Sequence, residues 1–338
     1  MKQNLIETVN EYLSLGINQQ LDYEKFYLYS IITHSTAIEG STVTEIENQL
    51  LFDEGISTNK SMAEQLMNLD LKKAYEQSFI YAKSHADFSI ELLCSLAALV
   101  MQNTGSTYKT IGGDFSSAKG DLRLLNVSAG RGGKSYLAWQ KVPDRLQKFC
   151  DWLNTERKAV DKNDIHKLYE LSFEAHYHIV SIHPWADGNG RMSRLVMNMI
   201  QYEAGCIPSI VKKEKRAEYI QSLAQSQEKD DSKDFIDFMM NHHVDNLQKQ
   251  IDEYKASMES DDIKGGQKIS VGGQKKWSET TLKILELIKQ NPKISRKELC
   301  GELGINPSAV QKHIEKLKEA KMIERMGGAK GGEWRVNK

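Results

Sequence analysis

Nine consecutive residues, HPWADGNGR at positions 183–191, combine the side chains and the backbone that phosphate chemistry needs. Glycine permits the unusual dihedral angles that aim successive N–H groups into one concavity, and Gly188 and Gly190 flank Asn189 here. A residue before proline is pushed out of the α region, so the preceding helix must end by His183. A new helix is expected directly after the turn. The unpaired amides and the dipole at its N-terminus favour an anion, which predicts a phosphate-binding nest.

Two side chains of this stretch have candidate chemical roles. Asp187 would repel bound phosphates unless it holds a divalent cation, and Mg²⁺ commonly bridges a carboxylate and phosphate oxygens. The structural alternative for an Asp-Gly pair is an Asx-turn or a helix cap. His183 is the base of the segment at neutral pH, which makes it a candidate to take a proton from an incoming hydroxyl. A histidine before proline is otherwise a packed core residue, and we interpret the nearby His176 and His178 in that way.

Beyond the turn, Arg191, Arg194 and Asn198 fall within about 60° of one another on a helix of 3.6 residues per turn. Apolar residues between Met192 and Ile200 cover the opposite face, which is expected to be the buried one. Two arginines on one stripe beside an anion nest offer fork-shaped donors to more than one phosphate group. An exposed arginine pair is otherwise a solvated face, and it is the adjacent nest that favours the functional interpretation.

The stretch HPWADGNGRMSR resembles the signature H-x-F-x-D/E-G-N-G-R-x-x-R of the Fic (filamentation induced by cAMP) family, with Trp185 in the place of the usual phenylalanine. The resemblance covers about residues 100–255. Members of this family typically transfer AMP from ATP to a hydroxyl of a target protein. The resemblance implies that His183 is the base and that Asp187 holds Mg²⁺. It assigns the ATP phosphates to Gly188, Asn189, Gly190, Arg191 and Arg194, and the nucleoside side of the pocket to Asn198.

Residues 104–141 form a gap between the expected helices that is rich in Gly and Ser. A long structured loop inside a helical domain is more often functional than idle. The β-prone pieces around Leu122–Val127 and Lys134–Leu137 predict a hairpin with SAGRGG at its tip. The resemblance makes this segment the flap of the family, which would align a target segment by strand addition. The docking residues that it implies are Leu125, Asn126, Val127, Ser128, Ala129 and Gly130.

A second signature lies far upstream. The stretch STAIEG, from Ser35 to Gly40, resembles the inhibitory motif S/T-x-x-x-E-G/N of the family, with Ser35 and Glu39 in its fixed places. The resemblance implies that Glu39 pairs with Arg194 and occupies the space and charge meant for the γ-phosphate. Ser35, Glu39 and Gly40 are therefore the expected inhibitory residues. A glutamate near a helix end is ordinary by itself, but its place before the core fits the subclass with an N-terminal inhibitory helix.

Helices must position these residues. Five prolines in 338 residues, and apolar residues at three- and four-residue spacing, predict a mostly α protein. The expected fold is a helical Fic core with a β-hairpin flap, followed by a small α+β winged-helix domain. The predicted parts are an N-terminal helical region with the inhibitory motif at residues 1–100, the catalytic core at 101–258, a linker at 259–276 and a winged helix-turn-helix domain at 277–338.

The C-terminal part carries its own signals. From Lys264 to Lys338, 17 Lys and Arg face 8 Asp and Glu, whereas the whole chain has a net charge of −1. An S-x-x-E capping box opens a helix at Ser295, and a further helix is expected to start at Pro307 with Asn306 as its cap. DNA recognition by the last helix and the wing is one interpretation; a module for protein contacts is the other. The candidate DNA contacts are Ser308, Gln311, Lys312 and Lys330.

Composition excludes several classes of protein. A hydrophobic share of 40% with 27% charged residues is ordinary for a globular protein. No apolar run is long enough for a membrane span, and the start of the chain is no secretory signal, so we expect a cytoplasmic protein without a membrane partner. The four cysteines form no CxxC pair and suggest neither a disulfide framework nor a thiolate zinc site.

The leading interpretation is an autoinhibited protein adenylyltransferase that uses ATP and Mg²⁺ and modifies a Ser, Thr or Tyr hydroxyl of a target protein or of itself. One alternative keeps the enzyme but reverses the chemistry, to removal of AMP. Another is a DNA-binding transcriptional regulator with the Fic core as nucleotide sensor. The sequence leaves the target protein, the DNA site and the oligomeric state open, and a homodimer is a reasonable expectation.

Overall fold

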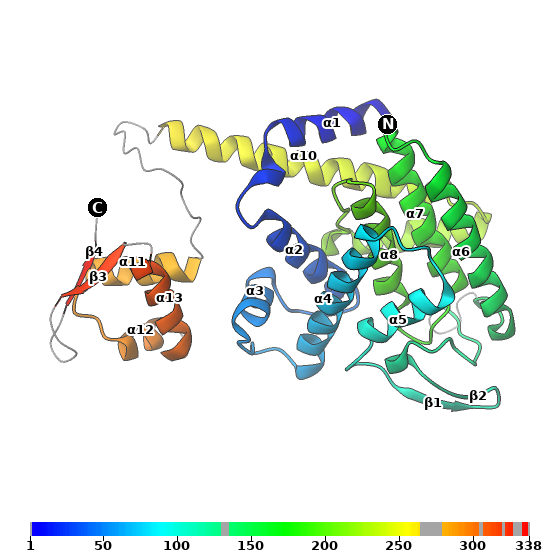
Figure 1. Cartoon of the computed structure of the whole chain (residues 1–338), viewed down its shortest axis with the longest axis horizontal. Coiled ribbons are helices and arrows are strands. Elements are labelled where there is room, and N and C mark those ends of the chain that lie inside the picture. The colour runs from blue at the N-terminus through cyan, green and yellow to red at the C-terminus, as the bar shows by residue number, and fades with distance from the viewer. Residues whose placement is uncertain are drawn as a thin grey trace. The chain divides into compact units, whose positions relative to one another are not determined.

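The computed structural model describes residues 2–129, 135–263, 279–303, 307–319, 322–326 and 333–336. The chain forms two compact units, residues 1–265 and 266–338, and each is described by itself (Figure 1). The mostly helical fold expected from the sequence is confirmed. Among the described residues, no helix combines the length and the apolar character that crossing a membrane requires.

Helices make up most of the first unit. In chain order they are α1 (Lys2–Ser14), α2 (Tyr23–Ile38), α3 (Glu45–Glu54), α4 (Met62–Lys83), α5 (Ile90–Val100), α6 (Val142–Ala159), α7 (Ile165–Ile182), α8 (Asn189–Glu203), α9 (Arg216–Lys229) and α10 (Lys233–Ile263). Local sequence sets several starts. Thr44 with Glu47, and Ser61 with Glu64, form capping boxes at α3 and α4, each satisfying two otherwise unpaired N–H groups.

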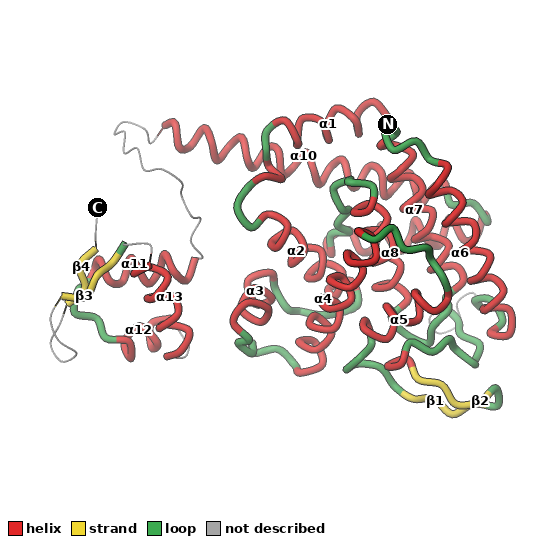
Figure 2. The backbone as a smooth tube through the Cα atoms, viewed as in Figure 1, coloured by secondary structure: helices red, strands yellow, loops and turns green. Residues whose placement is uncertain are grey.

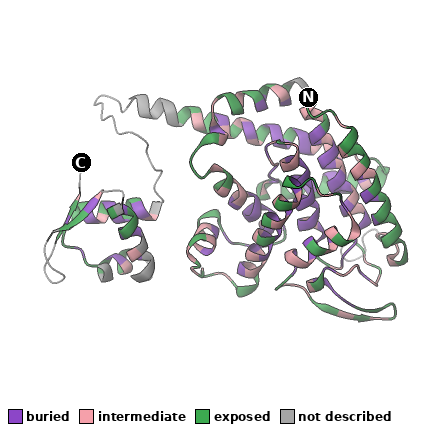
Figure 3. Cartoon of the chain, in the orientation of Figure 1, coloured by how far each residue is buried: buried purple, intermediate pink, exposed green. Residues whose placement is uncertain are grey.

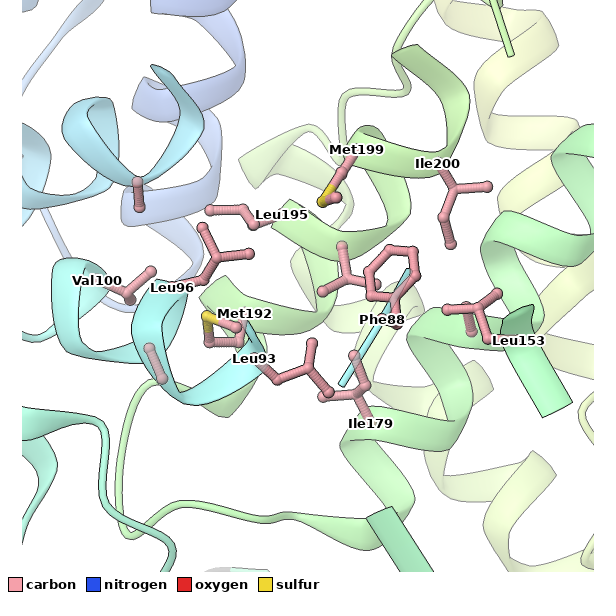
Figure 4. Packing of buried hydrophobic residues seen from close by; sticks show 14 of the residues in the cluster. Phe88, Leu93, Leu96, Val100, Leu153, Ile179, Met192, Leu195, Met199 and Ile200 are labelled. Atoms are coloured by element: carbon pink, nitrogen blue, oxygen red, sulfur yellow. The ribbon is translucent and has the colours of Figure 1, made fainter. Parts of the chain in front are cut away.

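Helix α8 lies at the centre of the first unit. Apolar side chains of α5, α6, α7 and α8, together with Phe88 from the loop before α5, point toward one another around it (Figure 4). The side chains labelled there are Phe88, Leu93, Leu96, Val100, Leu153, Ile179, Met192, Leu195, Met199 and Ile200. A second apolar cluster joins α1, α7, α9 and α10. Figure 3 shows buried residues concentrated in this central region. Helix α8 therefore has packed neighbours on every side, which fixes where the turn before it lies.

The segment between α5 and α6 differs from the prediction. Its hairpin is formed by β1 (Thr107–Thr110) and β2 (Gly113–Ser116), earlier in the chain than expected, with Thr107 opposite Ser116. The piece Leu122–Val127 forms no strand and is drawn as loop in Figure 2. Hydrogen bonds donated by the Arg123 side chain hold this piece in place of a strand ladder.

The second unit is small and has its own core. It contains α11 (Glu279–Gln290), α12 (Arg296–Leu303), α13 (Pro307–Glu319), β3 (Ile323–Met326) and β4 (Glu333–Val336). The two strands pair antiparallel, and the three helices with this hairpin make the expected winged-helix plan. The capping box at Ser295 is present, since the Glu298 amide donates to Ser295 Oγ and the Glu298 carboxylate accepts from the Ser295 amide. Helix α13 starts at Pro307, as predicted, while its expected cap Asn306 lies outside the described residues.

The first residues of the predicted linker belong to a helix. Helix α10 runs to Ile263, so residues 259–263 of the proposed linker are helical. This stretch has no clear apolar periodicity, but it contains neither glycine nor proline to end the helix. The next glycine along the chain is Gly265. The remainder of the predicted linker, from residue 264, lies outside the described residues.

Candidate active site

The backbone of the site turns at His183, as the sequence predicts. Helix α7 ends at Ile182, and His183 adopts a left-handed conformation with φ 52° while its N–H donates to Ile179 O at 2.9 Å. Positive φ is uncommon for a residue other than glycine. Proline at 184 then prevents the helix from continuing. The imidazole is thereby placed at the start of the loop that leads to α8.

The ring of His183 is covered by the flap segment. Tyr136 stacks on it with 3.9 Å between ring centroids and 18° between planes. Burial, with a smaller contribution from the nearby Arg123, lowers the pKa of His183 to about 4. A hydrogen bond to the Val180 backbone and the charges of Asp187 and Glu39 oppose this shift. The imidazole is consequently neutral at pH 7 and able to accept a proton.

The loop from residue 184 to residue 188 is closed by its own side chains. Trp185 is buried, and its indole N–H donates to Gly120 O at 3.1 Å, so it anchors the loop in the core as expected. The side chain of Asn189 accepts from the Trp185 amide at 3.1 Å and donates to the Trp185 carbonyl at 2.8 Å. These bonds occupy the Asn189 side chain, which the family resemblance assigns to the phosphates. In this structure Asn189 offers an anion its backbone N–H.

The predicted nest residues lie at the start of α8. Gly188 has φ 82°, and the first intrahelical bond runs from the Met192 amide to Gly188 O at 2.9 Å. The amides of residues 189–191 precede that bond and have no acceptor within the helix. A Cβ on Gly190 would lie 2.5 Å from Glu39 Oε1, so the Glu39 carboxylate sits directly against the nest. The carboxylate thus lies between Gly190 and Arg194.

Arg191 is buried, which contradicts the exposed stripe expected from the helical wheel. It is 3% exposed, because the face of α8 that carries it packs against the end of α5. Its guanidinium donates to Val100 O at 3.3 Å and contacts Met101 Sδ at 3.0 Å. Asp187 Oδ1 lies 3.8 Å away. Burial lowers the pKa of Arg191, with Asp187 opposing the shift.

Arg194 is buried as well and lies between two helices. It donates from Nε to Ser35 Oγ at 2.8 Å, from Nη2 to Ser35 O at 3.0 Å and from Nη2 to Glu39 Oε1 at 2.5 Å. Its Nη1 contacts Tyr219 Oη at 3.4 Å. Burial by itself would raise the pKa of Glu39, but the guanidinium of Arg194 more than offsets this and holds that pKa below its usual value. The pair is therefore ionised at neutral pH.

The residues of the upstream motif, Ser35, Glu39 and Gly40, differ in how closely they approach the site. Ser35 lies in the last turn of α2 and is buried, while Glu39 is the C-cap of that helix. The side chain of Glu39 is 34% exposed against 3% for Arg194, so Glu39 reaches in from the rim of the site. Gly40 follows with φ 105° and ends the helix without touching the nest.

Asn198 is not brought to the nest. It is 1% exposed, and its amide donates to Tyr75 Oη of α4 at 3.1 Å. In this structure it joins α8 to α4, away from the turn at residues 184–188.

One buried arginine attaches the flap segment to His183. Arg123 is fully buried and donates to the carbonyl oxygens of His183, Leu125 and Leu137. On the two sides of the flap, Ser128 and Ser135 form an isolated antiparallel bridge, and the Tyr136 amide donates to Val127 O at 3.0 Å. Of the predicted docking residues, Asn126, Ser128 and Ala129 are exposed, Leu125 and Val127 are half-buried, and Gly130 lies outside the described residues.

Sequence reasoning missed five residues of this region. Arg123 and Tyr136 lie in the Gly- and Ser-rich gap, where no periodicity points to them. The others surround Arg194: His176, interpreted as a core residue, and Ser193 and Tyr219, which had no assigned role. A buried tyrosine hydroxyl or histidine needs a polar partner, but the sequence does not show which partner it finds.

Metal ligands are sparse at the site. Within the part of the chain that the structure describes, no group of three or more His, Cys, Asp or Glu is placed to hold a metal ion. The side chain of Asp187 is 61% exposed beside the nest, and its Oδ1 accepts from the Gly188 amide at 2.6 Å. A single carboxylate fits Mg²⁺ that takes its other ligands from phosphates and water.

The second unit tests the DNA contacts only in part. Val310, Ile314 and Leu317 pack inward from α13, as expected. Gln311 donates to Glu315 at 2.6 Å on the outer face. Ser308 and Lys312 lie in α13, but their side chains, and the whole of Lys330, are outside the described residues.

Comparisons with known proteins agree with this geometry. Residues 87–201 match the model of the Fic/DOC family, and residues 278–324 match that of winged helix-turn-helix DNA-binding domains. The chain is 27% identical over 241 residues to the protein adenylyltransferase fic-1 of Caenorhabditis elegans, which is 70% of this chain and 43% of that protein. The chain thus spans less than half the length of this curated relative.

Two solved structures share the fold. One is a Fic domain-containing signaling protein from Bacteroides thetaiotaomicron, with a TM-score of 0.62 and 21% identity over 75% of this chain and 98% of the other. The other is a Fic family protein from Desulfovibrio desulfuricans, with a TM-score of 0.60 and 18% identity over 99% and 95%. Residues 87–201 therefore form a Fic/DOC family domain that is distantly homologous to Fic adenylyltransferases, and a winged helix-turn-helix domain follows it.

Proposed function

We propose that this chain is an autoinhibited protein adenylyltransferase, which transfers AMP from ATP to a Ser, Thr or Tyr hydroxyl of a target protein and of itself. The observation that carries the proposal is the position of the Glu39 carboxylate, against Gly190 and 2.5 Å from Arg194. A nest of free amides beside a buried arginine is a site for a phosphate chain. Here an internal carboxylate takes the place of one phosphate group.

The residues around the nest divide the work of binding. The amides of residues 189–191 receive the inner phosphates, and Arg194 receives an outer phosphate once Glu39 has left. Arg191 adds positive charge from its buried position beside Val100 O. Asp187 would hold Mg²⁺ together with phosphate oxygens, and the ion when bound would neutralise charge on the leaving group. Most of the catalysis in such a transfer comes from positioning and from charge stabilisation.

The chemical step needs one base. His183, neutral at pH 7, takes the proton of the incoming hydroxyl while the bond from that oxygen to the α-phosphorus forms. The bond from the α-phosphorus to the oxygen that bridges to the β-phosphate breaks, and pyrophosphate leaves with that oxygen. Negative charge brought by the bound phosphates raises the low pKa of the buried imidazole, which strengthens it as a base in the complex.

Labelled nucleotide tests the reaction type. We expect the Glu39→Gly protein, incubated with Mg²⁺, to retain label from ATP labelled at the α-phosphate and none from ATP labelled at the γ-phosphate. Retention of γ-label alone would mean phosphoryl transfer and would contradict the proposal. Release of AMP from a modified protein by water, with no incorporation, would favour hydrolytic removal of AMP instead.

Two matched variants identify the base. His183 and His85 both have φ near 50°, a conformation that asparagine tolerates better than most residues. His183→Asn is expected to abolish labelling. His85→Asn, at a surface position with its side chain 66% exposed, is expected to leave labelling unchanged. Equal labelling by both variants would remove His183 from the mechanism.

The second unit supports a further role. Its match to winged helix-turn-helix DNA-binding domains and the excess of Lys and Arg after residue 263 lead us to propose DNA binding. A gel-shift series over salt concentration tests it, since phosphate contacts make affinity fall steeply with salt. Binding that shows no salt dependence, or no binding at low salt, would contradict it.

A further inference from the structure

Arg194 is held from two directions. Helix α2 supplies the Ser35 hydroxyl, the Ser35 carbonyl and the Glu39 carboxylate. Helix α9 supplies the Tyr219 hydroxyl, 3.4 Å from Nη1. Among the hydrogen bonds that the structure describes for the Arg194 side chain, the bond to Tyr219 is the one that does not depend on α2. Any movement that withdraws Glu39 and Ser35 therefore leaves the α9 contact in place.

The chemistry of Tyr219 suits this contact. A guanidinium has donors only, so the Tyr219 oxygen accepts from Arg194 and keeps its own proton to donate. That proton has an acceptor in His176 Nε2, 2.8 Å away. His176 is fully buried, and burial together with the charge of Arg194 lowers its pKa well below the usual value. A neutral imidazole with a free lone pair on Nε2 is the state that this bond requires.

A second hydroxyl lies near the same histidine. Ser193 Oγ is 3.0 Å from His176 Nε2 and donates to the Gly190 carbonyl at 2.8 Å. Because the lone pair of Nε2 accepts the Tyr219 proton and the Ser193 proton goes to Gly190, no hydrogen bond joins Ser193 to His176 in this state. Tyr219, His176 and Ser193 are each at most 1% exposed, so water does not compete for the bonds that are made.

We propose that Tyr219 is a positioning residue, which holds the Arg194 guanidinium toward the phosphate site after Glu39 has been withdrawn. The inference rests on the proposed function and extends it. A flexible arginine would lose side-chain entropy on binding a phosphate, whereas an arginine already bonded to Tyr219 has lost that freedom in advance. In the inhibited form Ser35 and Glu39 hold Arg194, and the contribution of Tyr219 is redundant.

The test compares Tyr219→Phe with its parent in the Glu39→Gly background. Phenylalanine keeps the ring packing on Phe235 and removes the hydroxyl alone. We expect the dissociation constant for ATP and the KM for ATP to rise about fivefold to tenfold, which lies within the range of one ordinary hydrogen bond. Adenosine, which has no phosphates to meet Arg194, is expected to bind equally well to both proteins. In the wild-type background, where Glu39 is present, Tyr219→Phe should not raise AMP transfer.

Tyr177→Phe is the matched control. The Tyr177 hydroxyl also joins α7 to α9, donating to Ser226 O at 3.2 Å, but it has no connection to Arg194. Its loss should leave ATP affinity unchanged. Equal ATP affinity for Glu39→Gly with and without Tyr219→Phe, or a parallel loss of adenosine affinity, would overturn the role of Tyr219 alone. Failure of the Glu39→Gly protein itself to bind ATP would overturn the proposed function and this inference together.

Discussion

The Glu39 carboxylate lies 2.5 Å from Nη2 of Arg194, although 155 residues separate the two in the chain. The two members of the pair differ in burial. Arg194 is enclosed by α2, α8 and α9, whereas Glu39 enters from the rim at the end of α2. A buried arginine without a partner is costly, and in this structure the Glu39 carboxylate supplies the opposite charge.

Gly190→Ala tests whether the surface against Glu39 is the phosphate site. The new Cβ would lie 2.5 Å from Glu39 Oε1 and 3.1 Å from Arg194 Nη1, so neither a carboxylate nor a phosphate fits as before. We expect AMP transfer by the Glu39→Gly protein to fall at least about tenfold, equivalent to roughly 1.4 kcal/mol of lost binding.

Gly301→Ala is the control for that change. Gly301 lies in helix α12 of the second unit with open space around its missing Cβ. Alanine there is expected to leave labelling unchanged. Undiminished transfer after Gly190→Ala would show that the phosphates bind elsewhere.

Tyr136→Ala tests the cover over the base. Loss of the stacked ring exposes His183 to water, so the pKa of the imidazole should rise from about 4 toward 6.5. The base must be unprotonated to act. As the pH is lowered, transfer by the Glu39→Gly protein should therefore be lost at a higher pH when Tyr136→Ala is added. Arg123, which lowers this pKa, and Asp187, which raises it, remain in place.

Tyr136→Phe keeps the stacked ring and should keep the acid limb of the pH profile where it is. The pKa of His183 can be followed directly by NMR of its ring protons in the same proteins. If the acid limb does not move in Tyr136→Ala, the stacked ring does not control the protonation of His183.

Buried neutral histidines predict how stability depends on pH. Burial lowers the pKa of His242 to about 4 and that of His243 to about 3, both on α10. Between these values and 6.5 the unfolded chain binds more protons, so the free energy of unfolding should decrease as pH falls through that window. Each histidine contributes on the order of 3 kcal/mol over the full range.

Urea unfolding at several pH values measures this slope. His243→Phe, which keeps an aromatic ring beside Tyr169 and removes the titrating group, should make the slope shallower below pH 6.5. An unchanged slope would place the pH dependence in other groups.

Local rules explain what the sequence predicted well. A residue before proline ends a helix, and α7 ends at Ile182 as expected. Gly188 precedes α8 with φ 82°, whereas Gly190 already lies within the helix, which starts at Asn189. The winged-helix core followed from helical periodicity and a capping box. The pair of Glu39 with Arg194, expected from the family resemblance, is present in the structure.

Tertiary packing explains what the sequence could not predict. A helical wheel places Arg191 and Arg194 on a polar face, but α8 is surrounded and both are buried. Residues 122–127 form no strand ladder that would give a period-two pattern; Arg123 in this piece donates to three carbonyl groups instead. The contact between Tyr219 and His176 joins residues 43 positions apart on two helices, and no local pattern encodes it.

Incorporation of α-labelled AMP by the wild-type and Glu39→Gly proteins tests the central claim most directly. Asp22→Gly is the control, since Asp22 caps the other end of α2 with φ 58°, which glycine accepts. Loss of the charge-assisted bond between Glu39 and Arg194 should raise AMP transfer roughly tenfold or more. We predict that rise for Glu39→Gly, no rise for Asp22→Gly, and no labelling once His183→Asn is added. Equal incorporation by wild-type and Glu39→Gly proteins would contradict the account.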